Sequence, residues 1–136
     1  MKNYKYFSTT ADMGIEVIGE NISQIFLNAA KGMFNLISSP TNFKPKQEVK
    51  IKLKGESWEE LLFKWLGELL FYYDAYKIYF VDFQIIRIIP FEIEAVIKGE
   101  RIKNKKVERE IKAVTYHNLK ITQKNDIWEA KVLFDL

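Results

Sequence analysis

The fold is decided by one amphipathic stretch, WEELLFKWLGELLFYY, which occupies residues 58–73. Its large apolar side chains recur every three or four residues, the spacing of one face of an α-helix. Ser57 precedes the stretch and Glu60 follows three residues later, a pair typical of a helix N-terminus, where Glu59 also suits the helix dipole. The stretch therefore predicts a helix whose apolar face forms the core: Trp58, Leu61, Leu62, Trp65, Leu66, Leu69, Leu70 and Tyr73.

A second helix is predicted upstream of this stretch. Asn21 and Gln24 are spaced as a capping pair, and apolar residues from Ile22 to Leu36 again follow the helical period. The sequence Ser38-Ser39-Pro40 favours an end to this helix.

Strand patterns surround the two predicted helices. Alternating apolar and polar side chains predict strands over residues 4–7, 14–19, 49–54, 78–89, 91–98, about 107–122 and from 128 to the C-terminus, with a turn at 124–126. Helices near the start and strands grouped near the end are typical of the α+β class. We expect a single domain over residues 1–136, with two helices packed on a mixed, largely antiparallel β-sheet.

Composition narrows the class of protein. The apolar fraction of 48% indicates a packed globular domain, and the absence of cysteine excludes disulfides and thiolate metal sites. A formal net charge of +3 is too small to make nucleic acid the expected ligand. The first residues lack the apolar core of a signal peptide, and no apolar run is long enough to span a membrane. We therefore expect a cytoplasmic protein with no membrane partner.

The last strand ends in acidic groups. Trp128, Ala130, Val132 and Phe134 alternate with polar or intermediate residues, so Asp135 lies on the face opposite Phe134, next to the α-carboxylate of Leu136. Carboxylates held this close repel each other unless a positive charge joins them. The strand end is therefore a candidate cation site.

Asp12 has two interpretations. It lies in a loop just before Gly14, where an aspartate often hydrogen-bonds its own backbone in a turn. Alternatively, Asp12 joins Asp135 and Leu136 as oxygen ligands of one hard cation, for which Ca²⁺, Mg²⁺ and Mn²⁺ all qualify. Zinc is disfavoured because the chain has no cysteine and a single histidine.

Other candidate groups carry weaker signals. His117 lies in a predicted strand, where a structural role is more common than a catalytic one, and no nucleophile elbow, P-loop or dinucleotide-binding loop is present. Two lysine clusters, on residues 50–54 and 103–106, are either solvated surface or phosphate-binding groups. We favour solvated surface for both clusters.

Three segments together resemble one known family. Residues 10–17 (TADMGIEV), 111–117 (IKAVTYH) and 133–136 (LFDL) are similar in order and spacing to the archease family. The helical segment 65–70 and the Gly99-Glu100 turn fit the same family, so the resemblance extends from about Phe7 to Leu136.

The resemblance implies a function that the residue patterns alone do not. Archease proteins are small α+β activators of the RtcB-type RNA ligase, which joins exons in tRNA splicing and uses GTP. The implied protein is not an enzyme: it is a monomer whose partner is that ligase, with tRNA and GTP involved indirectly. By resemblance, the metal site comprises Asp12, Asp135 and Leu136 with Ca²⁺ as the expected ion, while Lys112 and His117 become functional candidates.

Two positions depart from the family pattern, and two other functions stay open. Thr9 replaces the usual histidine before the Thr-Ala-Asp motif, and Gly67 replaces the usual asparagine. A direct RNA-binding module would use the lysine clusters. A metal-dependent hydrolase would use His117 as a base beside metal-bound water, and it ranks last.

Overall fold

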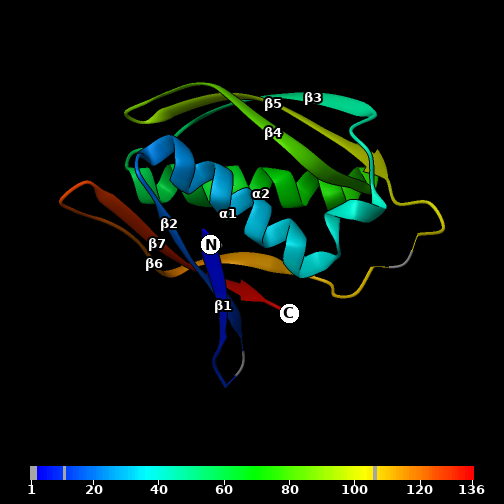
Figure 1. Cartoon of the computed structure of the whole chain (residues 1–136), viewed down its shortest axis with the longest axis horizontal. Helices are drawn as coiled ribbons and strands as arrows, with labels where there is room; N and C mark the ends of the chain where they lie inside the picture. The colour runs from blue at the N-terminus through cyan, green and yellow to red at the C-terminus, as the bar shows by residue number, and fades with distance from the viewer. Residues whose placement is uncertain (1–2, 11, 106) are drawn as a thin grey trace.

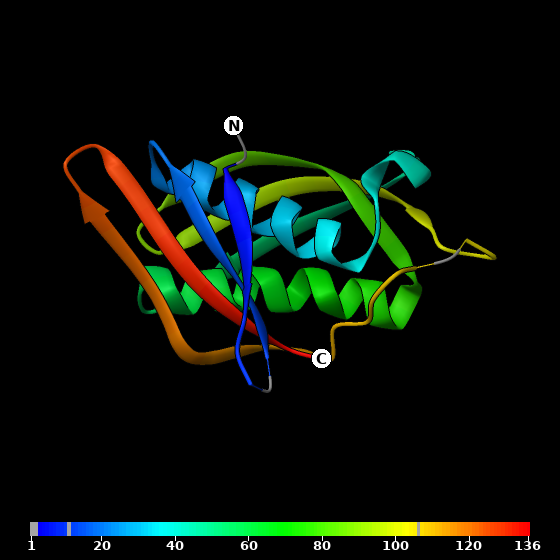
Figure 2. The same ribbon diagram turned by 60° about the horizontal axis from the view of Figure 1, so that its bottom comes forward.

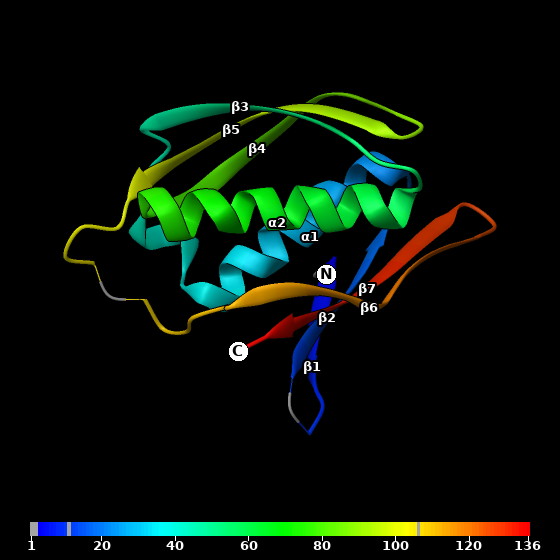
Figure 3. The same ribbon diagram turned by 180° about the vertical axis from the view of Figure 1, so that it is seen from behind.

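Two antiparallel sheets enclose two helices in the computed structural model, which describes residues 3–10, 12–105 and 107–136 (Figure 1). The elements in chain order are β1 (Tyr4–Ser8), β2 (Met13–Gly19), α1 (Ile22–Ile37), a 3₁₀ turn (Pro40–Asn42), β3 (Gln47–Lys54), α2 (Trp58–Tyr76), β4 (Ile78–Ile89), β5 (Glu92–Arg101), β6 (Ala113–Lys124) and β7 (Ile127–Asp135). Seen from behind, α2 lies between the two sheets with one flank uncovered (Figure 3).

Both predicted helix starts are confirmed. Ser57 Oγ accepts from the backbone N–H of Glu60 at 3.1 Å, and Glu60 Oε1 accepts from the N–H of Glu56 at 3.1 Å. The α1 cap has the same reciprocal form, because Asn21 Oδ1 accepts from the N–H of Gln24 at 2.9 Å while Gln24 Oε1 accepts from the N–H of Glu20 at 2.8 Å. These bonds satisfy N–H groups that would otherwise lack partners at each helix start.

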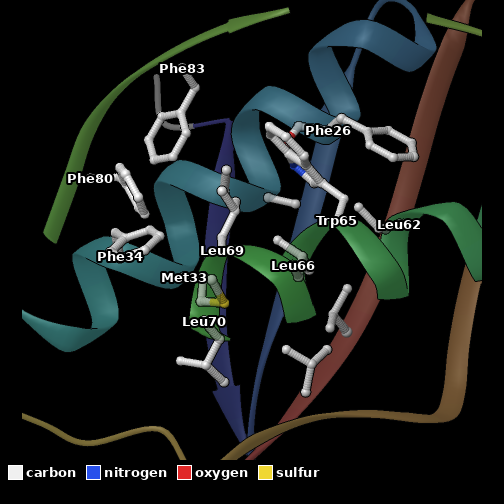
Figure 4. Close-up of a cluster of buried hydrophobic side chains, with 14 of the residues drawn as sticks. Phe26, Met33, Phe34, Leu62, Trp65, Leu66, Leu69, Leu70, Phe80 and Phe83 are labelled. Carbon is white, nitrogen blue, oxygen red and sulfur yellow. The ribbon is translucent and has the colours of Figure 1, made fainter. Parts of the chain in front are cut away.

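The core lies between the helices and the two sheets. The apolar face of α2 packs against α1, and the close-up in Figure 4 shows Trp65, Leu66 and Leu69 directed toward Phe26, Met33 and Phe34. Polar atoms in this core have partners: the Trp65 indole donates to the carbonyl of Phe26 at 3.0 Å, and the Tyr79 hydroxyl lies 2.8 Å from the carbonyl of Phe34. Buried polar groups with such partners avoid a large desolvation cost.

The strands form two sheets, not one. One sheet has the order β1-β2-β7-β6 and the other has the order β3-β5-β4. The α+β class and the two packed helices agree with the sequence prediction, whereas every strand pairing in the described residues is antiparallel and the expected mixed pairing does not occur there. The division into two sheets leaves each with an outward face free of helices.

The strand predicted over residues 107–122 is wrong at its start. Residues 107–112 form no strand, because the N–H groups of Glu108 and Arg109 both donate to the carbonyl of Ile37 at the end of α1, each at 3.0 Å. Ile111 is buried, so the segment is held by α1 and the core before β6 begins at Ala113. No helix among the described residues has the length and apolar character to cross a bilayer.

Candidate functional site

The pairing of β2 with β7 in the four-stranded sheet ends one residue short of both Asp12 and Asp135. β2 and β7 are antiparallel, with Gly14 opposite Leu133 and Met13 opposite Phe134. The next positions in this register are Asp12 and Asp135. Because Phe134 is fully buried and neighbours in a strand alternate between faces, Asp135 falls on the outward face, whereas Asp12 precedes β2 and is half-buried. The end of the chain and the β1–β2 turn accordingly lie on the same side of the molecule (Figure 2).

A tight turn holds the backbone of Asp12. The N–H of Thr9 donates to the carbonyl of Asp12 at 2.9 Å, and the N–H of Asp12 donates to Thr9 Oγ1 at 3.0 Å. Thr9 therefore contacts the backbone of Asp12. The turn interpretation of Asp12 and the ligand interpretation are compatible, since the turn uses only main-chain atoms of Asp12.

Lys112 lies next to Asp135 at the same sheet end. Its N–H donates to the carbonyl of Asp135 at 2.8 Å, and the lysine and aspartate residues are both exposed. Leu136 packs its partly buried side chain against the core and so anchors the strand end. We call Asp12, Lys112, Asp135 and Leu136 the acidic tip.

The acidic tip offers oxygen ligands of the type that hard cations prefer. The Asp12 and Asp135 carboxylates have no ion-pair partner among the described residues, while their backbone carbonyls already accept hydrogen bonds. No group of three or more His, Cys, Asp or Glu side chains is gathered there or elsewhere in the described part of the chain. The donor set thus fits Ca²⁺ or Mg²⁺ in kind, but a full shell of six or more oxygens needs water or groups from another molecule.

His117 lies away from the acidic tip. It belongs to a wide bulge in β6, where the pairing with β7 passes from Thr115–Leu133 to Lys120–Lys131. The bulge lies opposite Val132, which is roughly 10 Å from Asp135 at the usual rise of three strand residues. His117 is exposed, and this placement gives no support to a base acting on water at the tip. The bulge instead allows Tyr116 to stack on Phe63 of α2, with ring centroids 5.2 Å apart.

Several lysines of the two clusters pair with glutamates. In β3, Lys52 lies 3.7 Å from Glu94 and Lys54 lies 3.9 Å from Glu92. In the second cluster, Lys105 Nζ donates to Glu100 at 2.7 Å, while Lys106 falls outside the described residues. These ion pairs favour the interpretation of both clusters as structural surface.

One feature of the same sheet was missed by sequence reasoning. A hollow covers the outward face of the four strands, with Phe7, Lys120 and Lys131 in its lining. The turn at 124–126 could have indicated that Lys120 and Lys131 face each other, because pairing outward from a tight turn sets that register. The position of the hollow beside β1 and β2 depends on the order of the strands in the sheet.

The fold is that of a small α+β protein with two helices held between two antiparallel sheets. The candidate site consists of carboxylates near one end of the four-stranded sheet. The family model described as "Archease protein family (MTH1598/TM1083)" matches residues 4–136. The chain therefore belongs to the archease family.

Full-length relatives support this membership. Protein archease of Methanosarcina barkeri is 36% identical over 141 residues, covering 99% of this chain and 97% of that protein. Protein archease of Sulfurisphaera tokodaii is 32% identical over 139 residues, and the match covers all of both chains.

Solved structures share the fold. The solution structure of Methanobacterium thermoautotrophicum protein 1598 has a TM-score of 0.86 at 29% identity, covering all of both chains. The crystal structure of an archease from Thermotoga maritima, described there as a possible chaperone, has a TM-score of 0.68 at 24% identity, covering 97% of this chain and 96% of that one. At that identity, the second likeness concerns the fold alone.

Proposed function

We propose that this chain is a non-catalytic activator of an RtcB-type tRNA-splicing RNA ligase and that it acts through the acidic tip. One observation supports the site assignment: Asp12 and Asp135 are the residues directly beyond the last β2–β7 pair, Met13 with Phe134, and the N–H of Lys112 donates to the carbonyl of Asp135. The identity of the partner rests on membership of the archease family.

The tip residues have separate roles in this proposal. Asp12 and Asp135 hold a divalent cation, with Ca²⁺ the expected ion, and an oxygen of Leu136 completes the contribution of this chain. A bound divalent ion would supply the positive charge that relieves the repulsion between the carboxylates. Because this chain supplies few ligands, the remaining coordination positions are open to the ligase or to water.

Lys112 directs the contact with the partner. Its backbone is tied to Asp135, so its exposed ammonium group extends from a fixed point beside the two carboxylates. An ammonium group is a compact positive charge that pairs with a ligase carboxylate or a nucleotide phosphate. The tip therefore presents opposite charges side by side, which favours one orientation of docking.

Multiple-turnover ligation with a cognate ligase and GTP tests the proposal. Adding this chain should convert a reaction that stops after few turnovers into one that continues. Asp135→Asn keeps the side-chain shape but removes the charge and should abolish the stimulation. Asp126→Asn is a matched control, because Asp126 is an exposed aspartate in the turn at the far end of β7.

Calcium titration by calorimetry separates ion binding from activation. Loss of both Ca²⁺ binding and stimulation in Asp135→Asn, with Asp126→Asn unchanged, supports a cation-bearing tip. Stimulation that survives in folded Asp135→Asn contradicts the site assignment. The absence of any stimulation by the unmodified chain contradicts the activator function itself.

A further inference from the structure

The outward face of the four-stranded sheet is hollowed. The hollow has a volume of about 830 Å³ and is lined from all four strands, within the size range of small-molecule sites. None of the helices covers this face, because α1 and α2 lie on the inner side of the sheet (Figures 1 and 3). The hollow is separate from the acidic tip, although both lie on the same outward face.

A row of charged side chains crosses the hollow. The register places Lys5, Glu16, Lys131 and Lys120 in line on the four neighbouring strands. Glu16 is shared by two lysines, since its carboxylate lies 3.3 Å from Lys5 Nζ and 3.8 Å from Lys131 Nζ. Lys120 faces Lys131 directly across β6 and β7 and has no ion pair among the described residues.

Two directly opposed lysines are an unfavourable pair on a sheet. An anion placed between them would remove this repulsion and form charge-assisted hydrogen bonds with both ammonium groups. Asn118 and Thr122 also line the hollow and supply further polar atoms near Lys120. The charge pattern therefore suits a phosphate group, which has several acceptor oxygens.

An apolar floor lies next to the lysine pair. The ring of Phe7 covers Gly14 so closely that a Cβ at Gly14 would come within 2.3 Å of it. Lys131 Nζ lies 5.0 Å from the centre of the Phe7 ring, and Leu133 lies beside Gly14 in the register. A flat aromatic group attached to the phosphate could pack on this floor.

On β7 one carboxylate, Glu129, lines the hollow, and another, Asp135, lies beyond Leu133 outside it. Along β7 the outward residues are Glu129, Lys131, Leu133 and Asp135, so one basic and one apolar position lie between two acidic ones. A continuous nucleic-acid backbone would have to pass one of these carboxylates with its own negative charge. A single phosphate-bearing unit avoids both.

We propose that this hollow binds a free mononucleotide, with the phosphate between Lys120 and Lys131 and the base against Phe7 and Leu133. This site goes beyond the proposed activator function and does not depend on it. Its test needs no ligase, so failure of either proposal leaves the other intact.

Nuclear magnetic resonance titration of the ¹⁵N-labelled full chain tests the proposal, with AMP as the probe. AMP should shift the amide signals around Phe7, Lys120 and Lys131. Adenosine and inorganic phosphate should each bind more weakly, because each supplies one half of the interaction. A short oligoribonucleotide serves as the comparison for binding of an extended strand.

Variants of β6 make the test specific. Lys120→Gln should weaken AMP binding about tenfold, the effect of losing one charge-assisted hydrogen bond. Lys120→Arg keeps the charge and should retain most of the affinity. Lys124→Gln is the matched control, since Lys124 is exposed on the same strand but outside the lining of this hollow, and AMP affinity should be unchanged.

Three results would overturn the proposal. The first is the absence of AMP-induced shifts in a folded protein. The second is equal weakening by Lys120→Gln and Lys124→Gln, which would indicate general attraction by surface charge. The third is binding of the oligoribonucleotide without binding of AMP, which would indicate an RNA surface.

Discussion

Lysines lie on the outward faces of both sheets, but their neighbours differ. In the three-stranded sheet, Lys52 and Lys54 of β3 each face a glutamate of β5. In the four-stranded sheet, Lys120 faces Lys131. Lys52 and Lys54 thus face opposite charges, whereas Lys120 and Lys131 face a like charge. Alternating lysines in a sequence are therefore not informative about ligands until the residue opposite each one is known.

The same contrast appears at the sheet ends. Glu100 at the end of β5 is only 7% exposed and accepts hydrogen bonds from Lys105 Nζ at 2.7 Å and from the N–H of Lys44 at 2.9 Å, with Lys46 Nζ 3.1 Å away. Asp12 and Asp135, at the end of the other sheet, have no such cations paired with them in the described residues. We expect the cation-paired Glu100 to supply stability and the carboxylates of Asp12 and Asp135 to supply a binding site.

The largest expected effect on stability comes from adding a side chain where two strands of the three-stranded sheet approach closely. A Cβ at Gly99 would lie 2.1 Å from the backbone oxygen of Tyr79, which cannot move without disturbing the pairing of β4 and β5. Gly99→Ala should lower the free energy of unfolding by about 3 kcal/mol. Urea denaturation measures the change.

Gly67 provides the control for Gly99→Ala. A Cβ added there would meet no atom within 4 Å, and the residue lies inside α2. Gly67→Ala should raise the free energy of unfolding by about 1 kcal/mol, because alanine has the higher helix propensity. Stability changes opposite in sign to those expected for the two variants, or no change in Gly99→Ala, would contradict this prediction. Either result would show that β4 and β5 separate more easily than their register indicates.

A second prediction concerns acid sensitivity of the paired sheet. Hydrogen bonds from Lys105, from the N–H of Lys44 and from Lys46 lower the pKa of Glu100 from 4.5 to about 2. The folded state therefore favours the charged carboxylate, and this contribution is complete above the unfolded pKa. It should be lost as the pH falls from about 4.5 toward 2.

Glu100→Gln tests the origin of this acid sensitivity. The variant should be less stable than the unmodified chain near neutral pH, and the difference should shrink as the pH falls through that range. Unfolding measured across the range by circular dichroism gives both curves. Glu48→Gln is the control, since Glu48 is exposed and 3.9 Å from Lys98. A constant difference between Glu100→Gln and the unmodified chain would contradict the proposed origin.

A smaller effect tests the comparison of the two lysine pairs directly. Lys52→Gln removes an attraction and should lower the free energy of unfolding by about 0.3 kcal/mol, whereas Lys120→Gln removes a repulsion and should raise it by a similar amount. Both changes should diminish in high salt, because the charges are exposed. If both variants changed the free energy of unfolding in the same direction in low salt, cross-strand charge would not be the cause of the changes.

The smallest expected effect is on function. Replacing Lys50, Lys52 and Lys54 together with Gln should leave both ligase stimulation and AMP binding unchanged, because these lysines face away from the other sheet and two of them pair with glutamates. A loss of salt-dependent RNA binding in this variant would instead favour the direct RNA-binding module.

Local sequence was a reliable guide to single elements. Ser57 with Glu60 and Asn21 with Gln24 marked both helix starts, since a capping pair and its helix are neighbours in the chain. The alternation of residues 128–134 also indicated correctly which side chains of β7 are buried. For the candidate site, the sequence pointed to Asp12 and Asp135 as possible partners, and both lie directly beyond the last pair of β2 and β7, which leaves their joint role a prediction.

Predictions failed where a distant segment decides the structure. Residues 107–112 were predicted to begin a strand, yet the N–H groups of Glu108 and Arg109 bond to the end of α1. The pairing of β6 shifts between Thr115 and Lys120, so the place of His117 on the sheet could not be read from its local pattern. A bulge changes the register beyond it, so the face and neighbours of every later residue follow from pairing that local periodicity does not encode.

The sequence by itself determined the two helices, their N-terminal caps, and the buried face and acidic end of β7. These depend on side chains within a few residues of one another, whose spacing sets the periods of helix and strand. The tertiary structure alone decided the division into two sheets, the placement of Asp12 and Asp135 directly beyond the last β2–β7 pair and the hollow around Lys120 and Lys131. Each of those requires strands far apart in the chain to choose partners, and that choice is made by burial of the shared core.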